Sequence, residues 1–136
     1  MTALNHDSTI ARWKEATNPK PPLGIYVHIP FCVRKCHYCD FNSGPWSESA
    51  RLRYLETLQE EIRNTPYKGC PARTMFFGGG TPSELTIVEL QSLVTTLNQA
   101  FQFEEDSEWS IECNPGTMSR DYFPGLRELG FNRVSL

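Results

Sequence analysis

Short apolar runs alternate with helical patterns from Leu23 to the last residue, and this alternation limits the fold more than any other feature. Runs rich in β-branched and aromatic residues occupy 23–29, 73–77, 109–113 and 131–136. Each has the length and composition of a buried strand. Strands that alternate with helices build right-handed βαβ units and a parallel sheet. The sequence therefore predicts an α/β fold with repeated βα units.

The helical segments between these runs carry start and stop signals. The first helix is expected over 47–64. Thr86 followed by Glu89 predicts a capping box at the start of the second helix, and Gly130 is well placed to end the third, around 120–129. The apolar faces expected to pack on the sheet are Leu52, Leu55, Leu58 and Ile62 in the first helix, and Leu90, Leu93, Val94, Leu97 and Phe101 in the second.

The two ends of the chain differ from this pattern. Residues 1–22 are polar and rich in proline, and we expect a tail there, ahead of a domain over 23–136. At the other end Leu136 falls within a strand, although parallel strands are normally covered on both faces. We therefore expect either a fragment of a longer barrel-like protein or a sheet whose remainder comes from elsewhere.

Composition excludes several classes of protein. The net charge is -3 and the basic residues are scattered, which disfavours binding to nucleic acid or anionic lipid. No stretch approaches the roughly 18 apolar residues of a membrane span. The N-terminus lacks the apolar core of a secretory signal and carries Asp7 and Glu15, which transit peptides avoid. We expect a cytoplasmic protein, in which five cysteines favour metal or redox chemistry over disulfides.

Cys32, Cys36 and Cys39 form a C-x3-C-x2-C cluster directly after the first strand. Closely spaced thiolates suit a soft metal centre, and three interpretations remain open. A structural zinc ion would need His28 or His37 as a fourth ligand. A disulfide with a spare thiol is disfavoured in a reducing compartment. A [4Fe–4S] cluster held by three cysteines leaves one iron open to a substrate or cofactor.

The spacing, together with the preceding "YVHIPFC", resembles the radical S-adenosylmethionine (SAM) superfamily, in the branch of oxygen-independent coproporphyrinogen III oxidases and HemW-type heme chaperones. The resemblance implies the first part of a partial (β/α)6 TIM-like barrel, ending after its fourth strand, with a [4Fe–4S] cluster on the three cysteines. It also implies SAM beside Tyr26 and Tyr38. Phe31 and Phe41 are expected only to pack around the cluster.

A glycine run and a carboxylate follow the next two strands. Successive glycines let the backbone approach a ligand closely, and "GGGTPS" lacks the lysine of a phosphate-binding loop. The resemblance implies that Gly79, Gly80 and Thr81 receive the ammonium group of SAM, and that Glu112 holds its ribose. Cys113 and Cys70 are expected to be small core residues. Arg133 could face a substrate or solvent and is left out of the predicted site.

The ending "CDFNS" separates the two members of the branch. Coproporphyrinogen oxidases continue as C-x3-C-x2-C-x-C, whereas this chain has Phe41 at the position of the extra cysteine. The resemblance therefore favours a HemW-type chaperone that binds heme as cargo, transfers it to an accepting protein and uses an electron donor. An oxidase that decarboxylates coproporphyrinogen III in heme biosynthesis is the alternative, and an inactive fragment is another. Enzymatic activity stays undecided.

Overall fold

The computed structural model describes residue 11 and residues 21–40 and 42–136. Its centre is a four-stranded sheet in the order β1-β2-β3-β4, with every neighbouring pair parallel. The elements are β1 (Leu23–Ile29), α2 (Glu48–Arg63), β2 (Pro71–Gly79), α3 (Ile87–Ala100), β3 (Gln102–Glu112), α4 (Tyr122–Leu129) and β4 (Arg133–Ser135). Short 3-10 turns follow β2 and β3, at Pro82–Glu84 and Pro115–Thr117.

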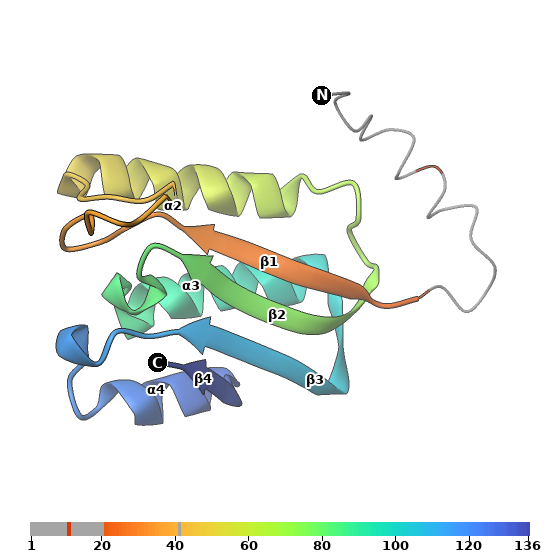
Figure 1. Ribbon diagram of the computed structural model, residues 1–136. Helices are drawn as coiled ribbons and strands as arrows, with labels where there is room; N and C mark the ends of the chain where they lie inside the picture. The colour runs from red at the N-terminus through yellow and green to blue at the C-terminus, as the bar shows by residue number, and fades with distance from the viewer. Residues whose placement is uncertain (1–10, 12–20, 41) are drawn as a thin grey trace.

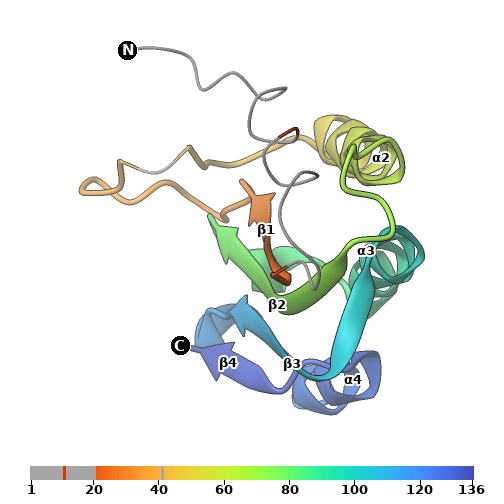
Figure 2. The ribbon, with the colours of Figure 1, turned by 90° about the vertical axis from the view of Figure 1, so that its right-hand side faces the viewer.

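The consecutive strand order places all three helices on one side of the sheet. Each right-handed crossover advances by one strand in the same direction, so α2, α3 and α4 cover the same face. The sheet curves with these helices outside it (Figures 1 and 2). This is the arrangement of a singly wound barrel, and the prediction of an α/β fold with the first βα units of a TIM-like barrel is confirmed.

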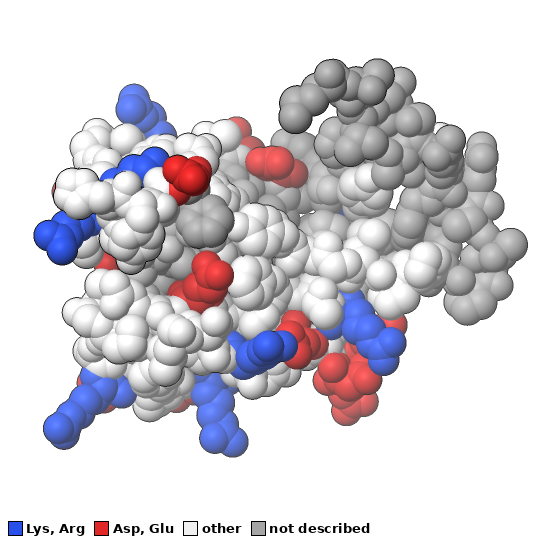
Figure 3. Space-filling view, viewed as in Figure 1, with Lys and Arg blue, Asp and Glu red and all other residues white. Residues whose placement is uncertain are grey.

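The core lies between the sheet and the helices. Every second residue of the central strands points into it, and Ile29, Met75, Phe77 and Ile111 are fully buried. The opposite face carries the alternate residues and has no helix over it (Figure 2). In the space-filling view of this second face the surface over the strands is mostly uncharged, with Lys and Arg mainly around its edge (Figure 3).

Most of the expected helix ends and strands are confirmed. Thr86 and Glu89 form the capping box at the start of α3, and Gly130 ends α4 in the left-handed conformation, with φ of 103°. The third strand starts earlier than its apolar pattern suggested, at Gln102 rather than at residue 109. Its first half is acidic but still pairs with β2, where Arg73 forms ion pairs with Glu104 and Asp106.

One predicted core residue is wrong. Leu52 was expected on the buried face of α2, yet it is 51% exposed. In this turn the inward positions belong to Arg51 and Tyr54, because Arg51 contacts Glu89 of α3 and the Tyr54 hydroxyl donates to the carbonyl of His28, at 2.6 Å. Polar partners on neighbouring elements therefore decide the rotation of the helix here. The apolar spacing alone could not show them.

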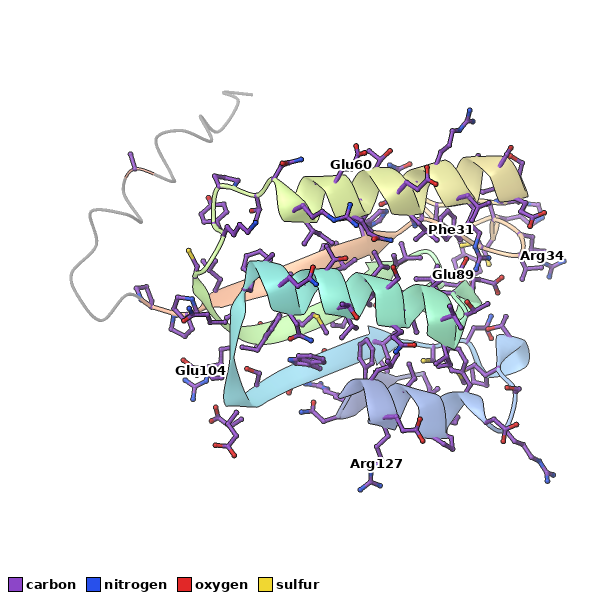
Figure 4. All side chains as sticks on the ribbon, turned by 180° about the vertical axis from the view of Figure 1, so that it is seen from behind. Phe31, Arg34, Glu60, Glu89, Glu104 and Arg127 are labelled. Atoms are coloured by element: carbon purple, nitrogen blue, oxygen red, sulfur yellow. The ribbon has the colours of Figure 1, made fainter. Side chains whose placement is uncertain are left out.

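Arg51 joins α2 to the start of α3. Its guanidinium lies 2.6 Å from a Glu89 carboxylate oxygen and donates to the carbonyl of Glu84, at 2.7 Å. It also lies over the Phe31 ring, 5.3 Å from the centroid. Figure 4 shows Phe31 and Glu89 at the same end of the two helices. Burial raises the pKa of Glu89, but hydrogen bonds from Arg51 and Thr86 outweigh this effect and leave that pKa lowered.

Within the described residues, no helix is long and apolar enough to cross a bilayer. The predicted tail at 1–22 falls almost wholly outside the part of the chain that the structure describes, so the predicted boundary at Leu23 stays a prediction.

Replacing Arg51 by Ala should lower the free energy of unfolding by about 2 kcal/mol, because partly buried hydrogen bonds to a charged group are lost. Chemical denaturation measures this change. Arg63→Ala is the matched control, since Arg63 is exposed and, within the described part of the chain, its side chain bonds to Gln59 of its own helix. Equal losses in the two variants would contradict the role assigned to Arg51.

Candidate functional site

Three loops meet at the carboxyl edge of the sheet and enclose one cavity. The cysteine loop (30–47) follows β1, the glycine loop (79–83) includes the last residue of β2, and the Asn-Pro-Gly loop (113–117) follows β3; all lie at the same end of the strands (Figure 1). The cavity has a volume of about 560 Å³, within the usual range for small-molecule sites. Its lining includes Cys32, Cys36, Cys39, Ser43, Gly79, Gly80, Thr81, Glu112, Asn114 and Thr117.

The glycine loop holds the base of the cysteine loop through the backbone. The N–H of Gly80 donates to the carbonyl of Ile29 and the N–H of Thr81 donates to that of Phe31, both at 2.7 Å. These bonds continue the β1–β2 ladder past the end of β1. A Cβ on Gly80 would lie 2.7 Å from the Phe31 carbonyl oxygen and 2.9 Å from Cys32 Sγ. Only glycine permits this approach.

The far end of the cysteine loop returns to the same point. Cys32 N–H donates to the Gly44 carbonyl and Gly44 N–H donates to the Pro30 carbonyl, both at 2.9 Å. Pro30 has no N–H of its own, so the segment around Gly44 can bond only to the Pro30 carbonyl. Cys32 is therefore fixed by backbone contacts on both sides.

An aromatic cluster packs below the cysteine loop. The rings of Phe31, Trp46 and Tyr54 meet edge to face, with centroids 5.3–5.5 Å apart, a favourable geometry. Phe31 is buried and packs in this aromatic group, while its predicted place beside a cluster stays a prediction. Phe41, expected in the same role, falls outside the described residues.

A hydroxyl group accompanies each cysteine sulfur of the loop. Thr81 Oγ1 donates to Cys32 Sγ and Ser43 Oγ lies beside Cys39 Sγ, both at 3.7 Å. Hydrogen bonding to Cys36 raises the pKa of Tyr38, and the charges of Cys36 and Cys39 add to this effect. Tyr38 is 88% exposed. The structure thus brings the three predicted ligands and Thr81 to one cavity and leaves Tyr38 at its outer rim.

In residue type the donor set matches an iron–sulfur cluster. Three soft thiols share one cavity, and none is in a disulfide. Among the residues that the structure describes, no group of three or more His, Cys, Asp and Glu side chains is positioned to hold a metal ion. Arg34, close to Cys32 and Cys36 in sequence, also lines this cavity, and its side chain extends outward at that end of the fold (Figure 4).

Glu112 and the glycine loop are joined directly. The N–H of Gly79 donates to a carboxylate oxygen of Glu112, at 3.2 Å. A carboxylate can accept further bonds, and Glu112 lines the cavity as the last residue of β3. Gly79 has a φ of 117°, a conformation that residues with a side chain rarely adopt. Cys113, the next residue, is buried, and burial raises the pKa of its thiol to about 11.

Tyr26 and His28 form a hydrogen-bonded chain on the uncovered face of β1. His28 Nε2 lies 3.0 Å from the Asn42 carbonyl, which can only accept, so this nitrogen carries the proton. Nδ1 then accepts from the Tyr26 hydroxyl, at 3.1 Å. Burial and the charge of Glu112 raise the pKa of Tyr26, which keeps that hydroxyl protonated. With both nitrogens engaged, His28 is not turned toward the thiols as a zinc ligand.

Two further cysteine predictions concern the core. Cys70 and Cys113 are both buried, which confirms the expectation that they are small core residues.

Arg133 lies on the exposed β4 and pairs with Glu108, at 3.1 Å. Its omission from the predicted site agrees with these surroundings.

No sequence motif singled out Ser43 or the polar side chains of the Asn-Pro-Gly loop. Asn114 N–H donates to Ser83 Oγ at 2.9 Å, and Ser83 Oγ lies 3.1 Å from Thr117 Oγ1. Thr117 in turn donates to the Asn114 carbonyl. These bonds tie the glycine loop to the Asn-Pro-Gly loop. The "NPG" turn was visible in the sequence, but its contact with "GGGTPS" depends on the pairing of β2 with β3.

The chain matches the radical SAM superfamily over residues 26–136. It is 40% identical to the heme chaperone HemW of Synechocystis and to that of Escherichia coli, over 85% of this chain and 29% and 32% of those proteins. It is 34% identical to the oxygen-independent coproporphyrinogen III oxidase of Synechocystis, over 98% of this chain and 30% of that protein.

The solved structure of coproporphyrinogen III oxidase (HemN) from E. coli, described as a radical SAM enzyme, is similar in fold. The two superpose with a TM-score of 0.82 at 35% identity, over 93% of this chain and 29% of that one. The chain thus spans less than a third of the length of these relatives. The identities to the chaperones and to the oxidases are too close to separate the two.

Replacing Gly80 by Ala should destabilise the protein by about 1–3 kcal/mol, the usual cost of overpacking, because the new Cβ meets backbone atoms of the cysteine loop. It should also increase the reaction rate of the Cys32 thiol with a thiol reagent. Gly44→Ala is the matched control, since a Cβ there meets nothing within 4 Å. If Gly80→Ala and Gly44→Ala have the same free energy of unfolding and the same rate of reaction at Cys32, the close approach of Gly80 to the cysteine loop affects neither property.

Proposed function

The chain belongs to the radical SAM superfamily, and on that basis we propose that it binds a [4Fe–4S] cluster and SAM in the three-loop cavity and acts as a heme chaperone of the HemW type. The observation that carries the proposal is the meeting of the three thiols, the glycine loop and Glu112 around one cavity. These groups come from positions as far apart as Cys32 and Glu112.

Each group has a distinct chemical task in this proposal. Cys32, Cys36 and Cys39 hold the cluster as thiolates, which suits their type and spacing. When bound, a cluster with one iron free of protein ligands supplies one-electron chemistry at that iron. The Phe31, Trp46 and Tyr54 rings exclude water from the inner side of the loop, and an apolar surround tunes a metal site.

The remaining groups are suited to SAM. In the glycine loop, Gly79, Gly80 and Thr81 present backbone atoms without bulky side chains, as acceptors for an ammonium group. Glu112 accepts from Gly79 and retains capacity for ribose hydroxyls. The Tyr26 hydroxyl donates to His28, so its oxygen can still accept a hydrogen bond from SAM. Tyr38 is exposed at the rim, where a flat ring can cover an adenine.

One observation favours the chaperone over the oxidase. Phe41 stands where the oxidases of this branch carry an additional cysteine. Heme is then bound cargo for an accepting protein, and a separate donor supplies electrons. We place this activity in the cytoplasm, in keeping with five cysteines outside disulfides. Coproporphyrinogen III decarboxylation is the alternative function.

Cluster binding is tested by anaerobic reconstitution with iron and sulfide. Replacing Cys32, Cys36 or Cys39 by Ala should abolish the brown absorption and the bound iron, because three ligands are the minimum for this site. Cys70→Ala, which removes a buried thiol outside the cavity, should retain both. Adding SAM should change the electron paramagnetic resonance spectrum of the reduced wild-type protein. Zinc held tightly, with no response to SAM, would overturn the proposal.

The chaperone and oxidase functions give opposite results in one pair of assays. The reconstituted chaperone should bind heme, seen as a Soret band that stays with the protein on gel filtration, and should leave coproporphyrinogen III unconverted. Formation of protoporphyrinogen IX under reducing conditions with SAM would establish the oxidase instead. Cys36→Ala protein serves as the control that separates cluster-dependent turnover from background oxidation.

A further inference from the structure

We propose that the hydroxyl groups of Thr81 and Ser43 donate hydrogen bonds to the sulfurs of Cys32 and Cys39 and thereby raise the reduction potential of the cluster. The inference rests on the proposed function, since it concerns residues of this chain that act on a cluster held by those cysteines. Thr81 has so far been considered only for SAM, and Ser43 for no role at all.

The contacts come from different parts of the fold. Thr81 follows β2 and its Oγ1 lies 3.7 Å from Cys32 Sγ, across 49 positions of sequence. Ser43 lies at the other end of the cysteine loop, and its Oγ is also 3.7 Å from Cys39 Sγ. Both contacts are partly buried. Two of the three ligand sulfurs thus have a hydroxyl partner on the inner side of the loop.

Both hydroxyl residues are held by bonds that do not involve sulfur. The Thr81 N–H donates to the Phe31 carbonyl at 2.7 Å. Ser43 precedes Gly44, whose N–H and carbonyl bond to Pro30 and Cys32. These backbone bonds therefore hold Thr81 and Ser43 close to the two sulfurs. Preorganised donors of this kind cost no rearrangement when charge develops next to them.

Metal binding also fixes the direction of the hydrogen bonds. A cysteine that ligates iron is a thiolate and can only accept. The Ser43 hydroxyl, which could either donate to or accept from a neutral Cys39 thiol, must then donate. Hydrogen bonds to the sulfurs are a recognised control of cluster potential, because they stabilise the extra negative charge of the reduced state. Their loss should make reduction harder.

Cys36 provides an internal contrast. Its hydroxyl partner is Tyr38, which is 88% exposed. Water can replace an exposed donor, so removal of the Tyr38 hydroxyl should change the potential little. Thr81 and Ser43 are half-buried, where solvent is less able to substitute for the lost group. Thr81 and Ser43 are therefore positioning residues, whose hydroxyl groups act on the cluster through the ligand sulfurs.

The test is a redox titration of the reconstituted cluster, followed by electron paramagnetic resonance. Thr81→Val and Ser43→Ala should each shift the midpoint potential to a more negative value, and the double variant should shift it by about the sum. Thr81→Ser and Ser43→Thr, which keep the hydroxyl, should restore the wild-type potential. Thr117→Val is the matched control, because Thr117 lines the same cavity but bonds to Ser83 and Asn114.

The outcomes separate this inference from the proposed function. A wild-type chain that assembles no cluster overturns both. Normal iron content in the variants with an unchanged potential overturns the inference alone, as does a shift of equal size in Thr117→Val. If Thr81→Val fails to hold iron, the Ser43 pair decides: an unchanged potential in Ser43→Ala counts against the inference, and a negative shift reversed in Ser43→Thr supports it.

Discussion

The structure depends on the two backbone hydrogen bonds that join the glycine loop to the end of β1. Donation from Gly80 and Thr81 to the carbonyls of Ile29 and Phe31 extends the sheet by one step beyond its last regular residue. This step fixes Cys32 against the glycine loop at a separation that leaves no room for a Cβ on Gly80. The position of Cys32 is thereby set by backbone hydrogen bonds that continue the sheet.

The singly wound sheet explains why the other groups reach the same cavity. Because every crossover runs in one direction, the loops after β1, β2 and β3 stand side by side at the carboxyl edge. Helices cover only one face of the sheet, and Tyr26, His28 and Glu112 alternate onto the uncovered face. Arg51 secures the arrangement from behind, since it connects α2, α3 and Phe31.

Local signals predicted the elements well, and long-range contacts caused the errors. The capping box of Thr86 and Glu89 and the left-handed Gly130 depend on neighbours a few residues away, so the sequence was sufficient for both. Leu52 was assigned to the core on spacing, yet Arg51 and Tyr54 occupy that side of α2 because their partners lie on α3 and β1. The acidic first half of β3 was missed because pairing with β2, rather than its own composition, makes it a strand.

The sequence by itself determined the parallel α/β fold, the three cysteines as candidate ligands and the glycine run as a point of close approach, since each depends on residue type and short spacing. Only the tertiary structure decided that Thr81 places a hydroxyl beside Cys32 Sγ, and that Glu112 accepts from Gly79. The physical reason is the range of the interactions. Hydrogen bonds across 33 and 49 positions exist only after the strands have paired, and no local pattern encodes which side chains will then face each other.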